Sequence, residues 1–162
     1  MILYHGSVEE VQKPNISFSK NYLDFGRGFY LTTHKKQAEK WAKRKATRKK
    51  TSAIVSVFEV KERFENFNTL EFKQENESWI DFVFECRKGS DEYKKYDIII
   101  GGVADDDVFR TLNLYFEGVW TKEKALEEVR YYDVNNQICF VNQEVIEKVL
   151  IFKNSYEVKN DR

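Results

Sequence analysis

Two glycines set one residue apart, Gly26 and Gly28, stand directly before the apolar run Phe29-Tyr30-Leu31. Glycine lets the backbone turn tightly or come close to another group, and the aromatic residues that follow are typical of a strand. The segment predicts a tight turn leading into a strand over residues 28–32, with another group lying against the glycines. Alone, such a pair indicates only a turn before a core strand. The pair becomes a stronger signal together with two further segments: Tyr4-His5-Gly6-Ser7 and Asn136-Gln137-Ile138-Cys139-Phe140.

The length of the chain limits the number of domains. A chain of 162 residues with 41% apolar residues can close one hydrophobic core and hardly two. We expect a single domain over residues 1–158 and a short C-terminal tail over residues 159–162. Lysine plus arginine and aspartate plus glutamate are equal, at 27 each. A nucleic acid or a membrane would therefore have to be met by a local patch of charge.

The sequence offers little for a membrane or for export. The longest apolar run, residues 98–104, is far too short to span a bilayer, and the first residues lack the basic region and the length of a signal peptide. We expect a soluble protein of the cytoplasm. Cys86 and Cys139 lie in apolar strings, form no C-x-x-C pair and are accompanied by only two histidines. They are predicted to be reduced core residues, without a disulfide framework or a metal site.

Hydrophobic periodicity predicts strands and helices that alternate irregularly. A first strand begins at Ile2 and ends at Gly6, which places His5 at its C-terminal edge. Further strands are predicted over residues 28–32, 53–60, 96–104, 137–141 and 151–158. Helices are predicted over 34–48 with Thr33 as N-cap, over 77–87, after 105–107, from 121 to 129, and after the cap Asn142. The pattern indicates an α+β domain with a split or mixed sheet flanked by helices, rather than a doubly wound sheet.

The outer face of the helix over residues 34–48 is densely basic. The lysines of its first turn oppose the helix dipole instead of complementing it. A solvated helix face is one interpretation; a phosphate-bearing ligand or an acidic partner is the one that the unfavourable charge favours. Glu39 is the one acidic residue of this segment. The cations are Lys35, Lys36, Lys40, Lys43, Arg44, Lys45, Arg48, Lys49 and Lys50.

The order of these motifs resembles that of a known enzyme superfamily. Tyr4-His5-Gly6-Ser7, followed by Gly26-Arg27-Gly28-Phe29-Tyr30-Leu31, resembles the H-G and G-x-G-x-Y elements of ADP-ribosyltransferases of the diphtheria-toxin and poly(ADP-ribose) polymerase type. Through Val103-Ala104-Asp105-Asp106 and Gln137-Ile138-Cys139-Phe140, nearly the whole chain is more similar still to a bacterial family of uncharacterised domains placed in that superfamily. The resemblance implies an ADP-ribosyltransferase-like split mixed β-sheet core.

The resemblance also implies roles in binding NAD⁺. His5 would hydrogen-bond the hydroxyls of the nicotinamide ribose, and the backbone of Gly6 would hold the nicotinamide amide. Tyr30 would stack on the nicotinamide ring, because aromatic faces pack well against a flat heterocycle. Trp41 occupies the offset of a second ring that closes this sandwich in the polymerases, although it equally suits a helix core. Three further contacts follow from the motifs: Ser7 on the ribose, Arg27 on the pyrophosphate as a charge-assisted donor, and Gly28 beside the co-substrate.

Gln137 departs from the pattern of the superfamily. Relatives commonly place a glutamate there, whose carboxylate holds a ribose hydroxyl and stabilises the oxocarbenium-like centre as nicotinamide leaves. A glutamine keeps the hydrogen bond but not the anion, and it would activate a nucleophile poorly. Either the chemistry is slower or another acid substitutes, with Asp106 as a candidate beside Asp105 and Asp107. Alternatively, these aspartates only cap a helix, which contributes about 0.5–2 kcal/mol.

Two classes of function remain open. The first is an NAD⁺-dependent ADP-ribosyltransferase with His5, Tyr30, Gln137 and Asp106 in its catalytic site. It would release nicotinamide and transfer ADP-ribose to a protein or nucleic acid, as a bacterial toxin or effector held in check by an antitoxin; with water as acceptor it would be an NAD⁺ glycohydrolase. The second is a degenerate module that binds NAD⁺ or another nucleotide without turnover, which Gln137 motivates. NAD⁺ is the co-substrate in the first, and neither class requires a metal.

Overall fold

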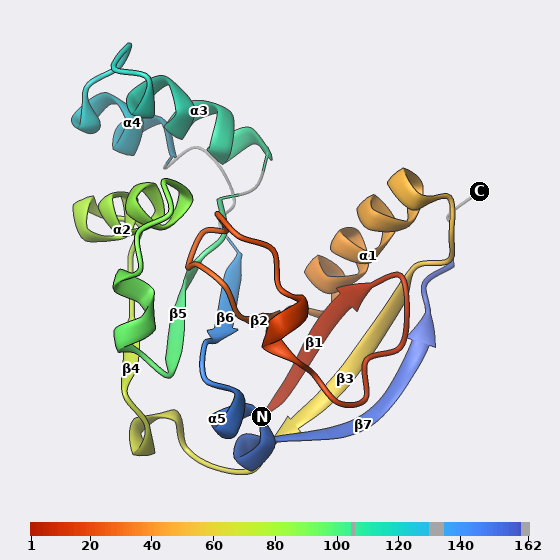
Figure 1. The fold of residues 1–162 in the computed structure, drawn as a ribbon. Helices are drawn as coiled ribbons and strands as arrows, with labels where there is room; N and C mark the ends of the chain where they lie inside the picture. Colours follow the sequence, from red (N-terminus) through yellow and green to blue (C-terminus); the bar gives the residue numbers. More distant parts are fainter. Residues whose placement is uncertain (105, 130–134, 160–162) are drawn as a thin grey trace.

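The computed structural model describes residues 1–104, 106–129 and 135–159. These residues form seven strands, five α-helices and three short 3-10 helices (Figure 1). The strands are β1 (Ile2–Ser7), β2 (Phe29–Leu31), β3 (Ile54–Val60), β4 (Thr69–Glu71), β5 (Ile98–Gly102), β6 (Asn136–Phe140) and β7 (Leu150–Glu157). The helices are α1 (Lys35–Lys49), α2 (Glu77–Arg87), α3 (Asp106–Phe116), α4 (Lys122–Val129) and α5 (Gln143–Val149), with 3-10 turns at Ile16–Phe18, Phe64–Asn66 and Glu92–Lys95.

The strands are divided between two sheets. The first has the order β1-β3-β7 and is antiparallel throughout. The second has the order β2-β6-β5-β4, in which only β4 and β5 run parallel. Segments from both halves of the chain are interleaved in each sheet, so the described residues form one α+β unit. This arrangement confirms the α+β class predicted from the sequence.

The two sheets touch at a single backbone bridge between Tyr4 and Thr32. The two residues exchange hydrogen bonds, with N···O distances of 2.9 and 3.0 Å. Among the described residues no further backbone pairing joins β1 to β2. Because backbone groups alternate along a strand, the N–H and C=O of Gly6 face the same way as those of Tyr4, away from β3. The backbone of Gly6 therefore faces the split between the sheets.

Helix α1 covers one face of the first sheet. Its buried alanines, Ala38, Ala42 and Ala46, pack against Val55 and other apolar side chains of that sheet. Close packing requires Gly6 at this point, because a Cβ there would collide with the carbonyl oxygen of Ala38. The sequence of β1 thus fixes how near the helix comes to the split.

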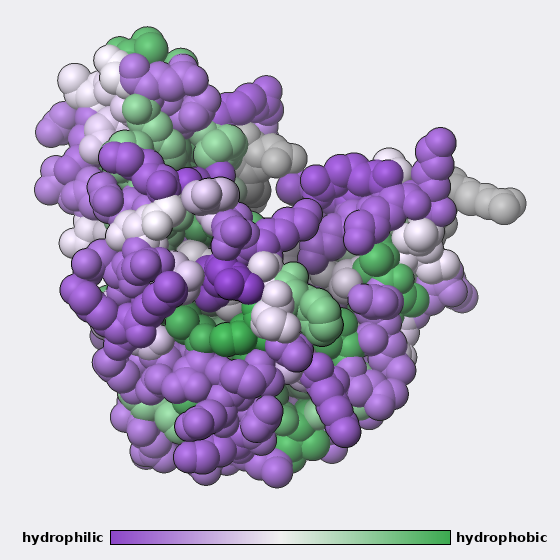
Figure 2. All heavy atoms as spheres, viewed as in Figure 1, coloured by the Kyte–Doolittle hydropathy of each residue, from purple (hydrophilic) through white to green (hydrophobic). Residues whose placement is uncertain are grey.

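The second sheet is buried on both faces. One face packs on α2, α3 and α4 around Phe25, Trp79, Ile99, Leu112 and Cys139. The other packs on the first sheet and α5 around Leu3, Phe29, Phe58, Ile138 and Phe140. Cys86 and Cys139 are buried core residues, as predicted. Figure 2 shows a largely hydrophilic surface over α1 and a notch between α1 and the lobe formed by α3 and α4.

Most elements lie within a few residues of their predicted bounds, and two details differ. Thr33 does not cap α1: the N-cap is His34, and its side chain makes no capping hydrogen bond. The short strand β4 is not predicted, because three residues in a polar connection show no periodicity. Asn142 does cap α5, accepting from the backbone N–H of Glu144 at 3.0 Å. No helix in the described part of the chain is long and apolar enough to cross a membrane.

Candidate functional site

Gln137 lies inside the fold, next to a buried carboxylate. Its Nε2 atom donates to Asp24 Oδ2 at 2.9 Å and to the carbonyl oxygen of Gly102 at 3.0 Å. Asp24 also accepts from Arg87 Nε at 2.8 Å, from Arg87 Nη2 and from the backbone N–H of Ala104 at 3.0 Å. Gln137 and Asp24 are 4% and 7% exposed. Both donor hydrogens of the amide are thus engaged with the protein itself.

Tyr30 shares one face of the second sheet with Gln137. Tyr30 pairs with Cys139, and Cys139 lies two residues from Gln137, so all three side chains point to the same side. The phenol oxygen donates to the carbonyl of Gly26 at 2.6 Å and accepts from the N–H of Phe25 at 3.0 Å. Burial raises the pKa of the phenol, with smaller contributions from Cys139 and Asp24. The hydroxyl therefore closes the glycine turn and stays protonated, which leaves the ring face for any stacking role.

His5 reaches Tyr30 through the backbone. Its Nδ1 atom lies 2.7 Å from the carbonyl oxygen of Tyr30, so this nitrogen carries the proton and donates. Its ring packs against that of Phe29 in a tilted arrangement at a centroid distance of 4.3 Å, on the opposite side of β2 from the Tyr30 side chain. Burial, and then the charge of Lys45, lower the pKa of His5 to about 3. His5 is therefore neutral at physiological pH, and its Nε2 atom carries a lone pair that can accept a hydrogen bond.

Lys45 lies at the split between the sheets. Its Nζ atom donates to the carbonyl oxygen of Gly6 at 2.9 Å, so the carbonyl that faces the split is bound by an ammonium group. Desolvation, followed by repulsion from neighbouring cations, lowers the pKa of Lys45 to about 8. The charge of Lys45 also lowers the pKa of His5, which precedes Gly6 in the chain. Lys45 therefore lies close to both residues.

One stripe of α1 spans this region. Gln37, Trp41 and Lys45 follow each other at four-residue intervals and therefore share a helix face. Gln37 donates through Nε2 to the carbonyl of Asn136 at 2.9 Å, at the start of β6, and Lys45 reaches Gly6 in β1. Trp41 lies between them, is half-buried, and belongs to none of the three apolar clusters of the described residues. The position of Trp41 fits the wall of the split better than the helix core.

Gln37 also has a polar atom without a partner. The residue is 6% exposed, and its Oε1 atom accepts no hydrogen bond from the described residues. A buried acceptor left unpaired costs about 1–3 kcal/mol, so such atoms in native proteins commonly have a ligand or water partner. This oxygen can accept from a donor of a bound molecule. It lies one helical turn before Trp41.

The glycine pair is packed by the protein itself. A Cβ at Gly26 would overlap the ring of Tyr93, and a Cβ at Gly28 would overlap Cys139 Sγ. Gly26 has a φ of 78°, which an L side chain rarely adopts. The group expected to lie against these glycines is therefore a neighbouring side chain, and Gly28 supports the site through packing.

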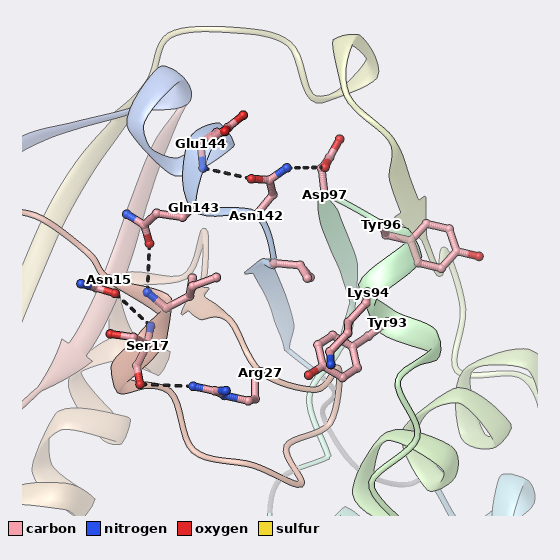
Figure 3. A pocket seen from close by; sticks show the side chains of 12 residues that line it. Asn15, Ser17, Arg27, Tyr93, Lys94, Tyr96, Asp97, Asn142, Gln143 and Glu144 are labelled. Atoms are coloured by element: carbon pink, nitrogen blue, oxygen red, sulfur yellow. Dashed lines mark hydrogen bonds between the residues drawn. The ribbon is translucent and has the colours of Figure 1, made fainter.

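Arg27 bonds to the connection between β1 and β2. Its Nη2 atom donates to the carbonyl of Ser17 at 3.2 Å, on the wall of a cavity of about 710 Å³ (Figure 3). Tyr93 and Lys94 face Arg27 across this cavity. The cavity lies at the Val141 end of the second sheet, roughly 13 Å along β6 from Gln137. None of His5, Tyr30 and Gln137 lines it.

The remaining predicted residues are placed as follows. Ser7 ends β1, with its side chain on the same face as that of His5. Asp105 lies outside the described residues, as does the side chain of Asp106, whose backbone begins α3. Asp107 pairs with Arg110 on the exposed side of that helix. Among the described residues no group of three or more His, Cys, Asp or Glu side chains is arranged to hold a metal ion.

Sequence reasoning does not single out three of these residues. Lys45 looks like one cation among many on a basic helix, although its spacing of four from Trp41 places the two on one stripe. Asp24 is a lone acid before the glycine pair, and its partner Arg87 is 63 residues away. Gln37 is a candidate only because the fold buries it, and the sequence does not reveal this burial.

The fold and this site define an α+β domain in which two sheets part beside a neutral histidine, a glycine backbone and a helix-borne tryptophan. The chain belongs to the family described as Protein of unknown function (DUF3990), which matches residues 1–152. No curated protein and no solved structure matches the chain.

Proposed function

We propose that this protein is an NAD⁺-dependent ADP-ribosyltransferase whose nicotinamide end binds at the split between β1 and β2. The observation that carries the proposal is the position of Trp41. It stands outside the apolar clusters, on a helix stripe that bonds to Asn136 through Gln37 and to Gly6 through Lys45. The resemblance to ADP-ribosyltransferases assigns Trp41, Gly6 and the neutral His5 to nicotinamide and its ribose.

Each group has chemistry that suits this ligand. The Nε2 lone pair of His5 can accept from a ribose hydroxyl, because Nδ1 is the protonated nitrogen. The backbone N–H of Gly6 offers a donor on the side of the split, where its carbonyl accepts from Lys45. The rings of Trp41 and Tyr30 offer flat faces for a heterocycle. The unpaired Oε1 of Gln37 is a further acceptor for an N–H donor of the ligand.

The reaction breaks the bond between ribose C1′ and the nicotinamide nitrogen. The electron pair goes to that nitrogen, which neutralises the pyridinium, and a nucleophile of the acceptor bonds to C1′ and loses its proton. Positive charge develops at the ribose during this step and calls for a nearby negative or dipolar group. Gln137 supplies no anion, and the Asp24 carboxylate beside it is neutralised by Arg87. We therefore expect turnover to be slow.

Release of nicotinamide from NAD⁺ by the purified protein tests the proposal. We expect release by the wild type and a loss of at least about tenfold in kcat/KM, or about 1.4 kcal/mol, in Trp41→Ala and in His5→Ala. Lys40→Gln serves as the control, because Lys40 is an exposed residue of the same helix. Equal rates in the wild type and both site variants would exclude these residues from the reaction.

A second function, binding of NAD⁺ without turnover, is favoured by the environment of Gln137. Both amide hydrogens bond to Asp24 and Gly102, so the residue has a structural task that needs no substrate. Calorimetry that detects NAD⁺ binding, combined with no nicotinamide release over hours, would favour this function. Measurable wild-type turnover would exclude it.

The acceptor and partners form part of the same proposal. Either a protein or a nucleic acid can accept ADP-ribose, and a bacterial toxin or effector of this kind would be held in check by an antitoxin. Brief induction in bacteria, followed by mass spectrometry of protein and nucleic acid, would identify added ADP-ribose. Modification that persists in Trp41→Ala would contradict the assignment of the site.

A further inference from the structure

Four cations gather where the two sheets part. Lys45, Arg48 and Lys49 lie within one turn of α1, at spacings of three and four residues. Lys20 comes from a different element, the long connection between β1 and β2. Its charge, with those of Arg48 and Lys49, lies close enough to Lys45 to lower the pKa of the Lys45 ammonium group. Two segments of the chain thus bring positive charge to the same place.

Within the described part of the chain, none of these four cations forms an ion pair with a carboxylate. Lys45 as a residue is exposed, yet its Nζ atom turns inward to the carbonyl of Gly6, a neutral acceptor. Like charges repel, so the neighbouring cations disfavour the charged form of Lys45. A bound anion would relieve this repulsion.

We propose that Lys20, Lys45, Arg48 and Lys49 form a binding site for the pyrophosphate of a dinucleotide, next to the backbone of Gly6. On binding, the ammonium group of Lys45 exchanges the Gly6 carbonyl for a phosphate oxygen, which frees that carbonyl for another donor of the same ligand. The proposal rests on the proposed function only for the identity of the dinucleotide as NAD⁺. It also differs from the expectation from the sequence that Arg27 holds the pyrophosphate. Arg27 lines the cavity at the Val141 end of the second sheet, and none of the four cations lines that cavity.

The position of the four cations favours a small ligand over a polymer. A nucleic acid would lie along the outer face of α1. Lys36 and Lys40 lie on that face, on roughly the opposite side of the helix axis from Lys45. Lys45 instead reaches the backbone carbonyl of Gly6, next to His5 in the chain, and the charges of Lys20, Arg48 and Lys49 act on Lys45. A pyrophosphate carries enough charge to be held by several cations at one point.

Calorimetric titration with inorganic pyrophosphate tests the site directly. We expect binding by the wild-type protein and at least tenfold weaker binding by the double variant Lys20→Gln with Lys45→Gln. Lys40→Gln, on the outer face of the same helix, should bind as the wild type does. ADP-ribose should compete with pyrophosphate, whereas nicotinamide alone should not.

Proton uptake gives a second reading of the same site. Because Lys45 has a pKa of about 8, a phosphate that pairs with it raises this pKa and draws a proton from the buffer near pH 8. The binding enthalpy should then vary with the ionisation enthalpy of the buffer, and this dependence should diminish in Lys45→Gln. The other charged or titratable groups that act on Lys45 are His5, which stays neutral, and the cations Lys20, Arg48 and Lys49.

The outcomes separate this inference from the proposed function. Pyrophosphate binding that depends on Lys20 and Lys45, together with no nicotinamide release, would overturn the transferase and retain the phosphate site. Nicotinamide release together with pyrophosphate binding that ignores both lysines would overturn the phosphate site alone. A single-stranded oligonucleotide that binds through Lys45 and is not displaced by pyrophosphate would overturn it in favour of a polymer.

Discussion

The side-chain nitrogen of Gln137 donates to the carboxylate of Asp24 at 2.9 Å inside the fold. Asp24 thus collects a guanidinium, a backbone N–H and an amide, which satisfies both of its oxygens. A glutamine at this position is what the carboxylate requires, because only a donor can face it. A glutamine at position 137 therefore has a physical reason in Asp24, two residues before Gly26.

Gln137→Glu should destabilise the protein. The new carboxylate would face Asp24 and the carbonyl of Gly102, so three acceptors would meet where two donor hydrogens stood before. We expect the free energy of unfolding to fall by about 2 kcal/mol or more, as measured by urea denaturation at neutral pH.

Two further variants separate charge repulsion from the loss of hydrogen bonds at this position. Gln137→Leu removes the same bonds without adding charge and should cost less than Gln137→Glu. Combining Asp24→Asn with Gln137→Glu restores one donor opposite one acceptor and should recover part of the loss. A Gln137→Glu protein as stable as the wild type would contradict the buried pair.

Acidification should weaken the fold through His5. The pKa of His5 in the folded protein is about 3, below its ordinary value of 6.5. Between these values the unfolded chain binds a proton that the folded chain does not, so stability falls as the pH is lowered and is fully present above 6.5. The slope is at most about 1.4 kcal/mol per pH unit for one proton.

Urea denaturation between about pH 4 and pH 6 measures this slope. Carboxylates contribute to it in every variant, so the comparison of the wild type with His5→Gln isolates the histidine. We expect a shallower dependence in His5→Gln. Equal slopes would show that His5 is protonated in the folded protein.

Trp41 and Trp79 should respond differently to truncation. Trp79 is fully buried and donates through Nε1 to the carbonyl of Gly102 at 3.2 Å. We expect Trp79→Ala to cost about 3–5 kcal/mol, the usual range for a buried aromatic residue. Trp41 is half-buried and outside the apolar clusters, so Trp41→Ala should cost less than about half of that.

Thermal and urea denaturation of the two variants measure this difference, with Trp120→Ala as an additional tryptophan control. A loss in Trp41→Ala as large as that in Trp79→Ala would make Trp41 a core residue and remove the main support for its place in the ligand site.

Local patterns in the sequence predict the elements well, and the pairing of strands less so. The bounds of α2 and the cap at Asn142 follow from residues within one or two turns of each other. The single bridge between Tyr4 and Thr32 and the packing of α1 against Gly6 both involve residues far apart in the chain. Sequence periodicity carries no information on such contacts.

The candidate site is predictable in its motif residues but not in their surroundings. His5 and Tyr30 stand in recognisable motifs, yet their hydrogen-bond partners are backbone carbonyls that no pattern names. The cation cluster depends on a lysine from the connection before β2 meeting the end of α1. Long-range charge placement of this kind arises from tertiary structure, and a single sequence offers no signal for it.

Two of the three positive-φ glycines of the described residues, Gly26 and Gly118, offer a matched test of packing at the glycine turn. Both have a φ of 78°, so alanine brings the same backbone strain at each, about 1 kcal/mol. A Cβ at Gly118 meets nothing within 4 Å, whereas a Cβ at Gly26 overlaps the buried ring of Tyr93. We expect Gly118→Ala to cost about 1 kcal/mol and Gly26→Ala at least about 2 kcal/mol more.

Urea denaturation of both variants measures the two costs, and their difference reports the packing contribution alone because the strain cancels. Gly26→Ala combined with Tyr93→Leu should recover part of the loss, since the smaller side chain leaves room for the new methyl group. If Gly26→Ala and Gly118→Ala cost the same, Tyr93 does not pack against the turn, and the space beside Gly26 is open to a ligand.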